Sequence, residues 1–238
     1  MIVDLLRKYA GQYHPLVPFE PSRDHCYRFD FTSDNPDLSG ELLANTELFS
    51  RYIEEKLRQN GCKYGIGGYG ELRVLYARSR HFDAVHGLVV AAGPEPRRLH
   101  LGLDIWGSAG TPIMAPIGGI LHSFAFNDAF GDYGATIILT HNLEGVSFHT
   151  LYGHLSINSL RNLCAGNRVR QGEIIGEMGM RFENGQWPPH VHMQIILDMQ
   201  GWEGDYPGVC PFSQKVDWMN NCPDPDLILH MNRFAIAR

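Results

Sequence analysis

Three histidines and one aspartate stand at spacings typical of metal-binding sites. His100 and Asp104 are separated by three residues in LHLGLD, and His190 and His192 flank a single valine in PPHVHMQI. Imidazole nitrogens and a carboxylate oxygen together make a ligand set that suits Zn²⁺. Three protein ligands leave the fourth position open for water, which is the arrangement of catalytic zinc sites. The pattern predicts a catalytic zinc site rather than a closed structural one.

The H-x-H pair fits a β-strand. Residues i and i+2 of a strand face the same way, with Cα atoms about 6.5–7 Å apart. Both imidazoles would then enter one cavity, with one close enough to bind a metal and the other a step away. The spacing leaves open which of His190 and His192 is the ligand. Val191, Met193 and Ile195 take the opposite face and are expected in the core.

The H-x-x-x-D pair requires a bend in the chain. In an ideal strand, residues i and i+4 stand about 13 Å apart, too far for two ligands that each lie about 2.0–2.2 Å from one zinc ion. Gly102 is the midpoint between His100 and Asp104, and a bulge is least unfavourable at a glycine. We expect the strand to bend there.

His154, in HTLYGHLS, is a further candidate for the same site. In a regular strand, Tyr152 and His154 share one face and His149 points to the other. His154 is therefore grouped with Tyr152, and His149 is interpreted as structural. Tyr152 is a weaker candidate for orienting a substrate, with simple packing as the alternative.

The segment that carries these residues reads as a series of short strands. β-Branched and aromatic runs recur between turns rich in Gly, Pro and Asn, without helical periods between them. The runs cover residues 87–92, 99–106, 118–126, 134–142, 146–155, 173–178 and 190–197. The pattern predicts a mainly β domain over residues 86–200, built as an antiparallel sheet or sandwich.

Residues 1–85 are expected to form an N-terminal extension with one helix at about 45–60. Asn45 or Thr46 can cap the start of that helix, and Gly61 ends it.

A glycine-dense loop over residues 63–82 is expected to lead into a short strand around Leu72–Tyr76. Within it, Arg73 and Tyr76 either line a substrate groove or form a solvated loop edge. Residues 201–238 are rich in proline and are expected to be an irregular C-terminal tail.

Composition limits the classes of function. The chain has 238 residues, of which 44% are hydrophobic and 19% charged, so it can bury a substantial core. Its 20 basic and 26 acidic residues give a net charge of −6, and no basic stripe stands out that could neutralise phosphates. We expect no nucleic-acid partner. No apolar run reaches the roughly 18 residues of a membrane span.

Cysteine usage bears on the cellular compartment. The five cysteines are dispersed, odd in number and without a CxxC pair, which favours reduced thiols. The first residues lack the apolar core of a signal peptide, so the chain as written is expected to be cytoplasmic. Removal of a leader would instead make the protein an exported one.

Four blocks of the sequence are similar to successive blocks of the M23 zinc metallopeptidases, the LytM/lysostaphin-like group. They are residues 97–121, 131–156, 166–179 and 188–196. The resemblance implies an antiparallel β-sandwich of the duplicated hybrid motif type. The flanking blocks GIGGYGELRVLY and GDYPGVCPF resemble a bacterial subgroup in which the peptidase-like domain is joined to phosphotransferase and aminotransferase domains.

The same resemblance implies the roles of the site residues. One Zn²⁺ per chain would be held by His100, Asp104 and His192, while His154 and His190 would be the catalytic, unliganded histidines. The implied activity is zinc-dependent hydrolysis of a peptide bond in a peptide or peptidoglycan-fragment substrate.

Two other classes of function remain open. The domain could bind zinc as a non-catalytic or regulatory module, although such a scaffold needs neither His154 nor His190. It could also be a structural β-sandwich without metal. The block at 166–179 further resembles the turn of biotinyl and lipoyl carriers, but no modifiable lysine lies there, so a carrier role is not expected. The oligomeric state is left open.

Overall fold

Apolar alternation in the middle of the chain produces long antiparallel strands, as its β-branched and aromatic residues favour. The structure, a computed structural model, describes residues 2–83 and 95–236. Its strands are β1 (Cys26–Phe29), β2 (Tyr64–Gly67), β3 (Arg97–His100), β4 (Leu103–Trp106), β5 (Pro112–Met114), β6 (Gly119–Asn127), β7 (Gly134–Leu143), β8 (Val146–Leu155), β9 (Arg168–Val169), β10 (Ile174–Glu177), β11 (His190–Ile196), β12 (Val209–Pro211) and β13 (Ala235–Ile236). Its α-helices are α1 (Ile2–Lys8), α2 (Gly40–Ala44), α3 (Thr46–Gln59), α4 (Lys215–Asn221) and α5 (Asp226–Leu229).

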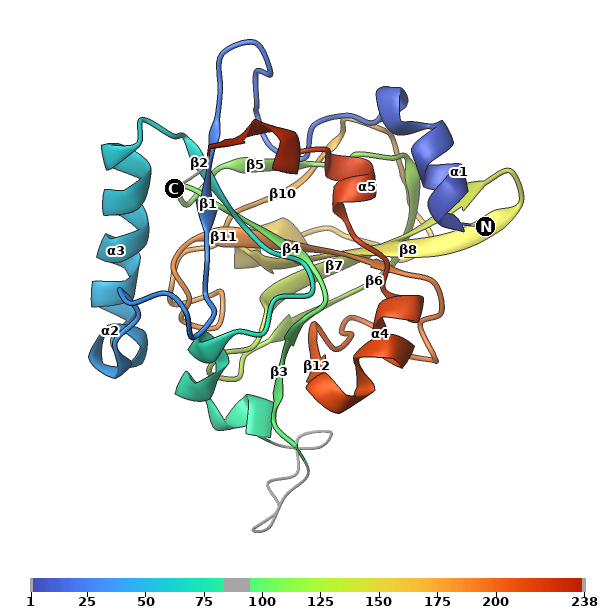
Figure 1. Cartoon of the computed structure of the whole chain (residues 1–238). Coiled ribbons are helices and arrows are strands. Elements are labelled where there is room, and N and C mark those ends of the chain that lie inside the picture. The colour runs from blue at the N-terminus through green and yellow to red at the C-terminus, as the bar shows by residue number, and fades with distance from the viewer. Residues whose placement is uncertain (1, 84–94, 237–238) are drawn as a thin grey trace.

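Nine strands of the described chain form one mixed sheet, in the order β13-β1-β2-β4-β11-β8-β7-β6-β9. From β2 to β9, neighbouring strands are antiparallel. The pairs β1–β2 and β1–β13 are parallel, so segments from both ends of the chain meet at one edge of the sheet (Figure 1). β11 lies between β4 and β8, which places the H-x-H pair at the centre of the sheet.

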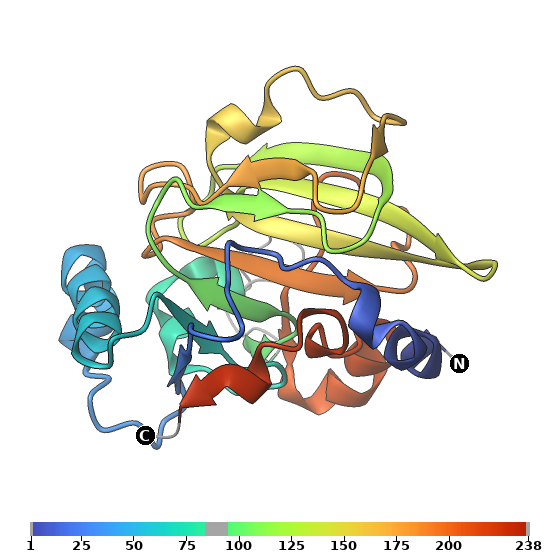
Figure 2. The same ribbon diagram turned by 90° about the horizontal axis from the view of Figure 1, so that it is seen from above.

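The strands β5 and β10 pair with each other and form a second layer over the large sheet (Figure 2). Ile113 and Ile175 from this layer share one apolar cluster with Ile137, Val191 and Met193 of the large sheet. The prediction of a mainly β sandwich with a helix-containing N-terminal segment is confirmed. The parallel pairs at the sheet edge are an addition, because the N- and C-terminal segments were not read as strands.

The helix predicted at about 45–60 is observed as α3. The side chain of Asn45 accepts hydrogen bonds from two backbone N–H groups of the first turn, at 2.9 and 3.1 Å. The buried face of α3 packs on an aromatic cluster, in which the rings of Phe49 and Trp106 lie 6.0 Å apart. The helix thereby supports Trp106, which is one wall of the site described below.

The glycine-dense segment differs from its expectation. Tyr64–Gly67 is strand β2 rather than loop, and its glycines allow a neighbour to approach: a Cβ at Gly65 would lie 2.2 Å from the ring of Phe29. The strand expected around Leu72–Tyr76 is wrong. The chain forms the 3₁₀-helix Val74–Arg78 there instead. Before this helix, Leu72 pairs with Leu99 of β3 through an isolated bridge, which does not extend into a strand.

The C-terminal residues 201–238 are also more regular than expected. They contain the strand β12, which pairs with β3, and the strand β13, which pairs with β1. The helices α4 and α5 lie between these two strands. The strand expected at residues 87–92 lies outside the described residues. The domain boundaries after residues 85 and 200 stay predictions.

All five cysteines are free thiols, four of them buried and Cys164 exposed. Within residues 2–83 and 95–236, no helix combines the length and the apolar character needed to cross a membrane.

Candidate metal centre

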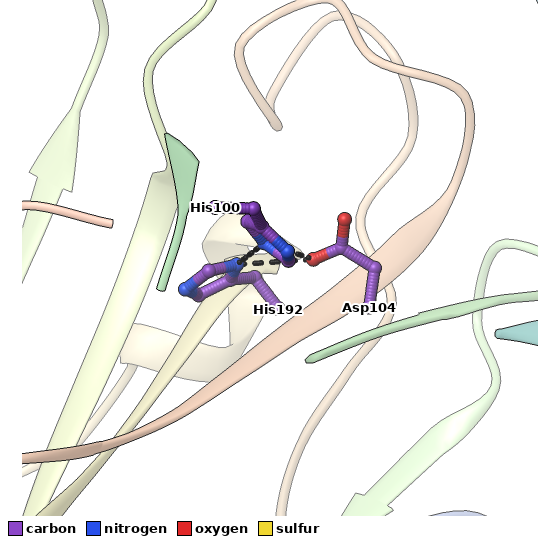
Figure 3. A group of neighbouring side chains, drawn as sticks. All are labelled: His100, Asp104 and His192. Atoms are coloured by element: carbon purple, nitrogen blue, oxygen red, sulfur yellow. Dashed lines mark hydrogen bonds and ion pairs between the residues drawn. The ribbon is translucent and has the colours of Figure 1, made fainter. Parts of the chain in front are cut away.

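Three ligand atoms from distant parts of the sequence meet at one point (Figure 3). His100 Nε2 lies 2.9 Å from His192 Nδ1 and 3.2 Å from Asp104 Oδ1, and the last two atoms are 3.0 Å apart. Each of the three residues is at most 3% exposed. The structure thus brings together the three residues predicted as metal ligands, here called the triad.

Local geometry of two strands places the triad. The strand expected over 99–106 is divided into β3 and β4, with the break at Leu101 and Gly102, as the H-x-x-x-D spacing required. β4 then pairs with β11 so that Asp104 stands directly opposite His192. A Cβ at Gly102 would lie 2.3 Å from the His192 ring, so only glycine lets the ring approach the bend.

The outward-facing ring nitrogens of both histidines have acceptors. His100 Nδ1 donates to the carbonyl oxygen of Gly68 at 2.9 Å, which leaves the lone pair of its Nε2 directed at the triad. His192 Nε2 lies 3.1 Å from Gln194 Oε1, and the amide nitrogen of Gln194 is itself committed to Pro207 O at 3.2 Å. His192 Nδ1 is therefore the nitrogen left free to bind a metal.

The carboxylate of Asp104 is held in its charged form. Its Oδ2 accepts a hydrogen bond from Arg73 Nη1 at 2.5 Å, while Oδ1 faces the two imidazoles. Burial opposes ionisation, but the interactions of the carboxylate with His100 and with the charge of Arg73 outweigh it and hold the pKa of Asp104 well below its ordinary value. Burial, and then the charge of Arg73, lowers the pKa of His100 to about 4. The triad therefore presents a neutral imidazole at His100, an anionic oxygen at Asp104 and the Nδ1 atom of His192.

This donor set fits Zn²⁺. Two ligand atoms bound about 2.0–2.1 Å from a tetrahedral zinc ion are about 3.3 Å apart, close to the separations within the triad. Each ligand also has the outer hydrogen bond that orients metal-binding side chains in proteins.

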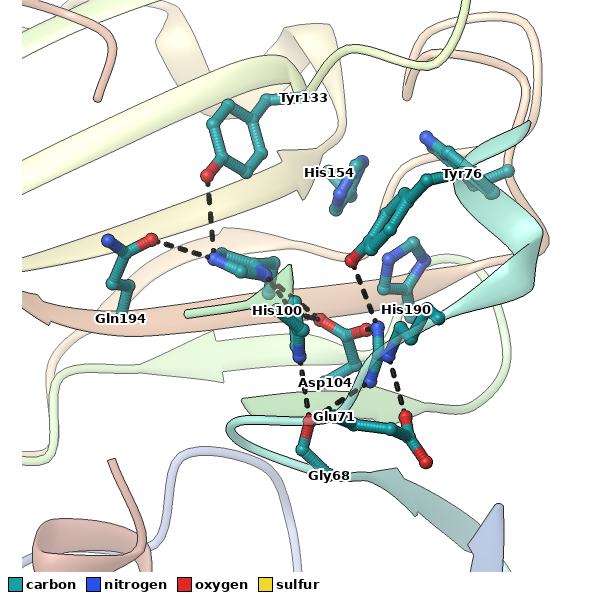
Figure 4. Close-up of polar contacts among 12 residues, drawn as sticks. Gly68, Glu71, Tyr76, His100, Asp104, Tyr133, His154, His190 and Gln194 are labelled. Carbon is teal, nitrogen blue, oxygen red and sulfur yellow. Dashed lines mark hydrogen bonds and ion pairs between the residues drawn. The ribbon is translucent and has the colours of Figure 1, made fainter. Parts of the chain in front are cut away.

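His154 and His190 form a second group, here called the histidine pair (Figure 4). Their ring centroids are 4.1 Å apart, and the His190 ring stacks on Trp106 at 4.0 Å. Nδ1 of His154 donates to Asn184 O at 2.9 Å, and Nδ1 of His190 donates to Pro188 O at 2.8 Å. In each ring, Nε2 is left with a lone pair and is free to accept a proton.

Burial keeps the histidine pair neutral. It lowers the pKa of His190 to about 4. It also lowers the pKa of His154 well below its ordinary value, and the neighbouring His190 and His192 rings add to the shift.

A match to a known family decides the class of this domain. Residues 98–203 match Peptidase family M23. We call this matching segment the M23 domain. The resemblance read from the sequence blocks is confirmed, whereas the suggested fusion subgroup stays a prediction.

Curated relatives align with less than half of this chain. Over 103 residues the chain is 35% identical to the DD-carboxypeptidase/endopeptidase Mpg of Neisseria meningitidis serogroup B, covering 43% of this chain and 21% of that protein. Over 102 residues it is 34% identical to an uncharacterized metalloprotease of Haemophilus influenzae, covering 42% of this chain and 19% of that protein. The chain thus spans about a fifth of the length of these relatives.

Among solved structures, the catalytic domain of the antimicrobial peptidase lysostaphin from Staphylococcus simulans aligns with 71% of this chain and 97% of its own. The sequence identity is 22% and the TM-score 0.39.

The side chain of His154 lies at the site because of an irregular backbone conformation. Tyr152 is paired with Met193 and lies in the apolar core, and regular alternation would send His154 to that same face. Instead, His154 has a φ of +62°, in the left-handed region, beside an irregularity in the β7–β8 pairing, and its ring lines the cavity. The grouping of His154 with Tyr152 is wrong, because it assumed a regular strand. Tyr152 does not line the cavity and instead packs in the apolar core.

A cavity of about 420 Å³ opens beside the triad and the histidine pair. His154, His190 and His192 line it from the M23 domain, while Arg73 and Tyr76 line it from the preceding segment. Of the two readings of Arg73 and Tyr76, the groove reading is the one that the structure supports, since both side chains are buried.

Sequence reasoning missed the residues that surround the triad. Gly68 accepts from His100, Gln194 contacts His192, and the hydroxyl of Tyr133 lies 3.4 Å from His192 Nε2. Gln194 carried a usable signal, since it stands two positions after His192 on the same face of β11. Gly68 and Tyr133 lie in loops far from His100 and His192 in the sequence, and no local pattern marks them.

Proposed function

We propose that this protein is a zinc-dependent peptidase, with one Zn²⁺ per chain held by His100, Asp104 and His192. The observation that carries the proposal is the position of the triad, which lies beside two neutral histidines at the wall of one cavity. The M23 domain supports peptide-bond hydrolysis as the reaction.

The ligand set indicates what the metal would contribute. When bound, zinc acts as a Lewis acid that lowers the pKa of a water molecule and polarises the carbonyl group of the scissile bond. Because the triad supplies three ligands, one coordination position stays available for reactants.

The histidine pair moves the protons. Nε2 of His154 or His190 can accept the proton of the attacking water, because burial and the Nδ1 hydrogen bonds leave that nitrogen unprotonated. The imidazolium that forms can then donate the proton to the leaving amine. Stacking of His190 on Trp106, together with the tilted contact between the rings of His190 and His154, holds both rings in place during the transfer.

The proposed substrate is a peptide of the peptidoglycan type. A relative with 35% identity over 103 residues is named a DD-carboxypeptidase/endopeptidase, which supports this substrate class. The walls of the cavity also carry Asp132 and Asp205, whose pKa values burial raises to about 6, so they are largely anionic at neutral pH.

The test combines metal content with product analysis. Elemental analysis of protein from zinc-supplemented cells should find close to one zinc per chain. Incubation with cross-linked peptidoglycan fragments should release peptides that mass spectrometry identifies, 1,10-phenanthroline should stop the release, and added zinc should restore it. Zinc binding without cleavage of any fragment would favour a non-catalytic zinc module, and absence of zinc would favour a structural sandwich.

A further inference from the structure

Arg73 contacts the triad although it lies outside the M23 domain. It is 2% exposed, and its guanidinium is surrounded by acceptors. Nη1 donates to Asp104 Oδ2 at 2.5 Å and to the Tyr76 hydroxyl at 3.2 Å, while Nε donates to Glu71 Oε2 at 2.7 Å. Nη2 lies 3.4 Å from the carbonyl oxygen of Gly68. The guanidinium therefore links a loop of the N-terminal segment to the carboxylate of the triad.

The segment around Arg73 also fixes a second ligand. The carbonyl oxygen of Gly68 accepts both from Arg73 Nη2 and from His100 Nδ1. Gly67 must be glycine for this arrangement, because a Cβ there would lie 2.6 Å from Arg73 Nη2. Two of the three triad residues thus take their orientation from residues 67–73.

The contact with Asp104 bears on how many oxygens can reach a metal. A free carboxylate can bind a metal through one or both oxygens. In this site, Oδ2 is taken by Arg73 and only Oδ1 faces the two imidazoles. Binding through both oxygens would occupy the coordination position that a water molecule requires. The guanidinium blocks that second mode.

Glu71 holds Arg73 in this position. The carboxylate of Glu71 accepts from Arg73 through Oε2 and from the backbone N–H of Phe31 through Oε1 at 3.2 Å. The buried positive charge of Arg73 therefore has two anionic partners, Glu71 and Asp104. A guanidinium that is held by two carboxylates keeps one orientation, whereas the guanidinium of an exposed arginine is free to move.

We propose that Arg73 is a positioning residue that keeps Asp104 as a single-oxygen ligand, so that the N-terminal segment completes the metal centre of the M23 domain. The inference rests on the proposed zinc site, and it adds that the M23 domain alone does not define the coordination of the metal. Arg73 contacts no reacting atom. Its effect passes through the orientation of Asp104.

The test uses Co²⁺ as a spectroscopic probe in the full chain. Four-coordinate Co²⁺ absorbs visible light more strongly than five- or six-coordinate Co²⁺, so absorption reports on whether Asp104 binds through one oxygen or two. In Arg73→Gln, the freed Oδ2 should join the metal, and the visible absorption per bound Co²⁺ should fall. Affinity for Co²⁺ should be unchanged or higher, because a positive charge next to the cation is lost. Hydrolysis should fall roughly 10–100-fold.

The conservative variant and a matched control separate positioning from folding. Arg73→Lys restores a charged donor for Oδ2 and should recover part of the Co²⁺ absorption and part of the activity. Arg58→Gln removes an arginine of the same N-terminal segment whose ion pair with Glu55 lies on the surface, and it should leave the Co²⁺ spectrum unchanged.

Should the Arg73 variants fail to fold, Glu71→Gln gives a second route, because it weakens the hold on Arg73 from the other side. It should shift the Co²⁺ spectrum in the same direction by a smaller amount. The inference is overturned if Arg73→Gln, or Glu71→Gln in its place, keeps the parent spectrum. A parent protein that binds neither Co²⁺ nor Zn²⁺ overturns the proposed function and this inference with it, whereas an unchanged variant spectrum overturns this inference alone.

Discussion

The triad and the histidine pair contain the same kind of side chain at the same degree of burial, yet their surroundings differ. In the triad, the imidazoles turn one nitrogen toward the carboxylate of Asp104 and the other toward an outer acceptor. In the pair, His154 and His190 donate from Nδ1 to backbone carbonyls and stack on aromatic rings. The neighbouring groups, not the residue type, therefore distinguish the proposed metal ligands from the proposed proton carriers.

The difference also explains how each group tolerates burial. The triad has one negative charge among its nitrogen atoms, which favours a cation at its centre. The pair has no anionic hydrogen-bond partner among the described residues, so its rings are stable in the interior only when neutral. A neutral imidazole is the form that can accept a proton at Nε2.

Loss of a triad residue should have the largest effect. We expect His192→Ala to lose nearly all bound zinc on dialysis and to show no detectable hydrolysis, because one of three protein ligands is gone. Zinc should raise the melting temperature of the parent but not of the variant, since metal binding is coupled to folding. Elemental analysis and calorimetry measure both quantities. A variant that retains a full equivalent of zinc would remove His192 from the ligand set.

Loss of a histidine of the pair should spare the metal. His190→Ala should retain zinc while its hydrolysis rate falls roughly 10²–10⁴-fold, the usual contribution of a positioned acid or base. For His154, Asn is the better replacement because it tolerates the left-handed φ of +62° at this position. If His190→Ala instead loses zinc, the assignment of the two histidines of the H-x-H motif is reversed.

Acid should destabilise the metal-free protein, and His141 shows how much burial alone contributes. Burial lowers the pKa of His141 to about 4, against about 6.5 in an unfolded chain. The unfolded state therefore takes up a proton first, and the free energy of unfolding should fall as the pH drops from 6.5 to 4, by at most roughly 3 kcal/mol for this residue.

His141 lies outside the site, where it contacts Gly118 O and the hydroxyl of Thr150. Urea unfolding between pH 4.5 and 7 should show a shallower pH dependence for His141→Gln than for the parent. His190→Ala should flatten the curve by a similar amount, because the pKa of His190 is also lowered to about 4 by burial. An unaltered slope in both variants would mean that burial does not keep these rings neutral.

The smallest effect is expected at His149, five residues before His154 on the same strand. His149 is partly buried and lies further along β8 from the site, opposite Ile196, whereas Gly153 stands opposite His192. Its ring lies 5.2 Å from that of His122. His149→Ala should keep zinc and hydrolysis at parent levels and change stability by about 1 kcal/mol or less. A loss of activity comparable with that of the pair would show that the site extends along β8 as far as His149.

Part of this site could be predicted from backbone geometry over a few neighbouring residues. Strand alternation predicted that His190 and His192 share a cavity, and the H-x-x-x-D spacing predicted the bend at Gly102, because both depend on backbone geometry within a few residues. The same alternation failed at His154, where one left-handed residue reverses the direction of the side chain.

Contacts between distant segments were not predictable in this way. The position of Arg73 against Asp104 depends on β2 pairing with β4, and the terminal segments gave no clear strand signal of their own. Only the family resemblance, which includes the order of the blocks along the chain, predicted that His192 rather than His190 is the ligand.

The pairing of β2 with β4 sets a limit on dissecting this protein. Gly65, Ile66 and Gly67 cover the edge of β4 opposite Trp106, Ile105 and Asp104. A fragment trimmed to the M23 match at residues 98–203 would expose that edge as a row of unpaired N–H and C=O groups, directly at Asp104. Such an open edge can pair with the same edge of another copy. We therefore expect the part of the chain that stays monomeric in solution to be longer than the segment that sequence similarity detects.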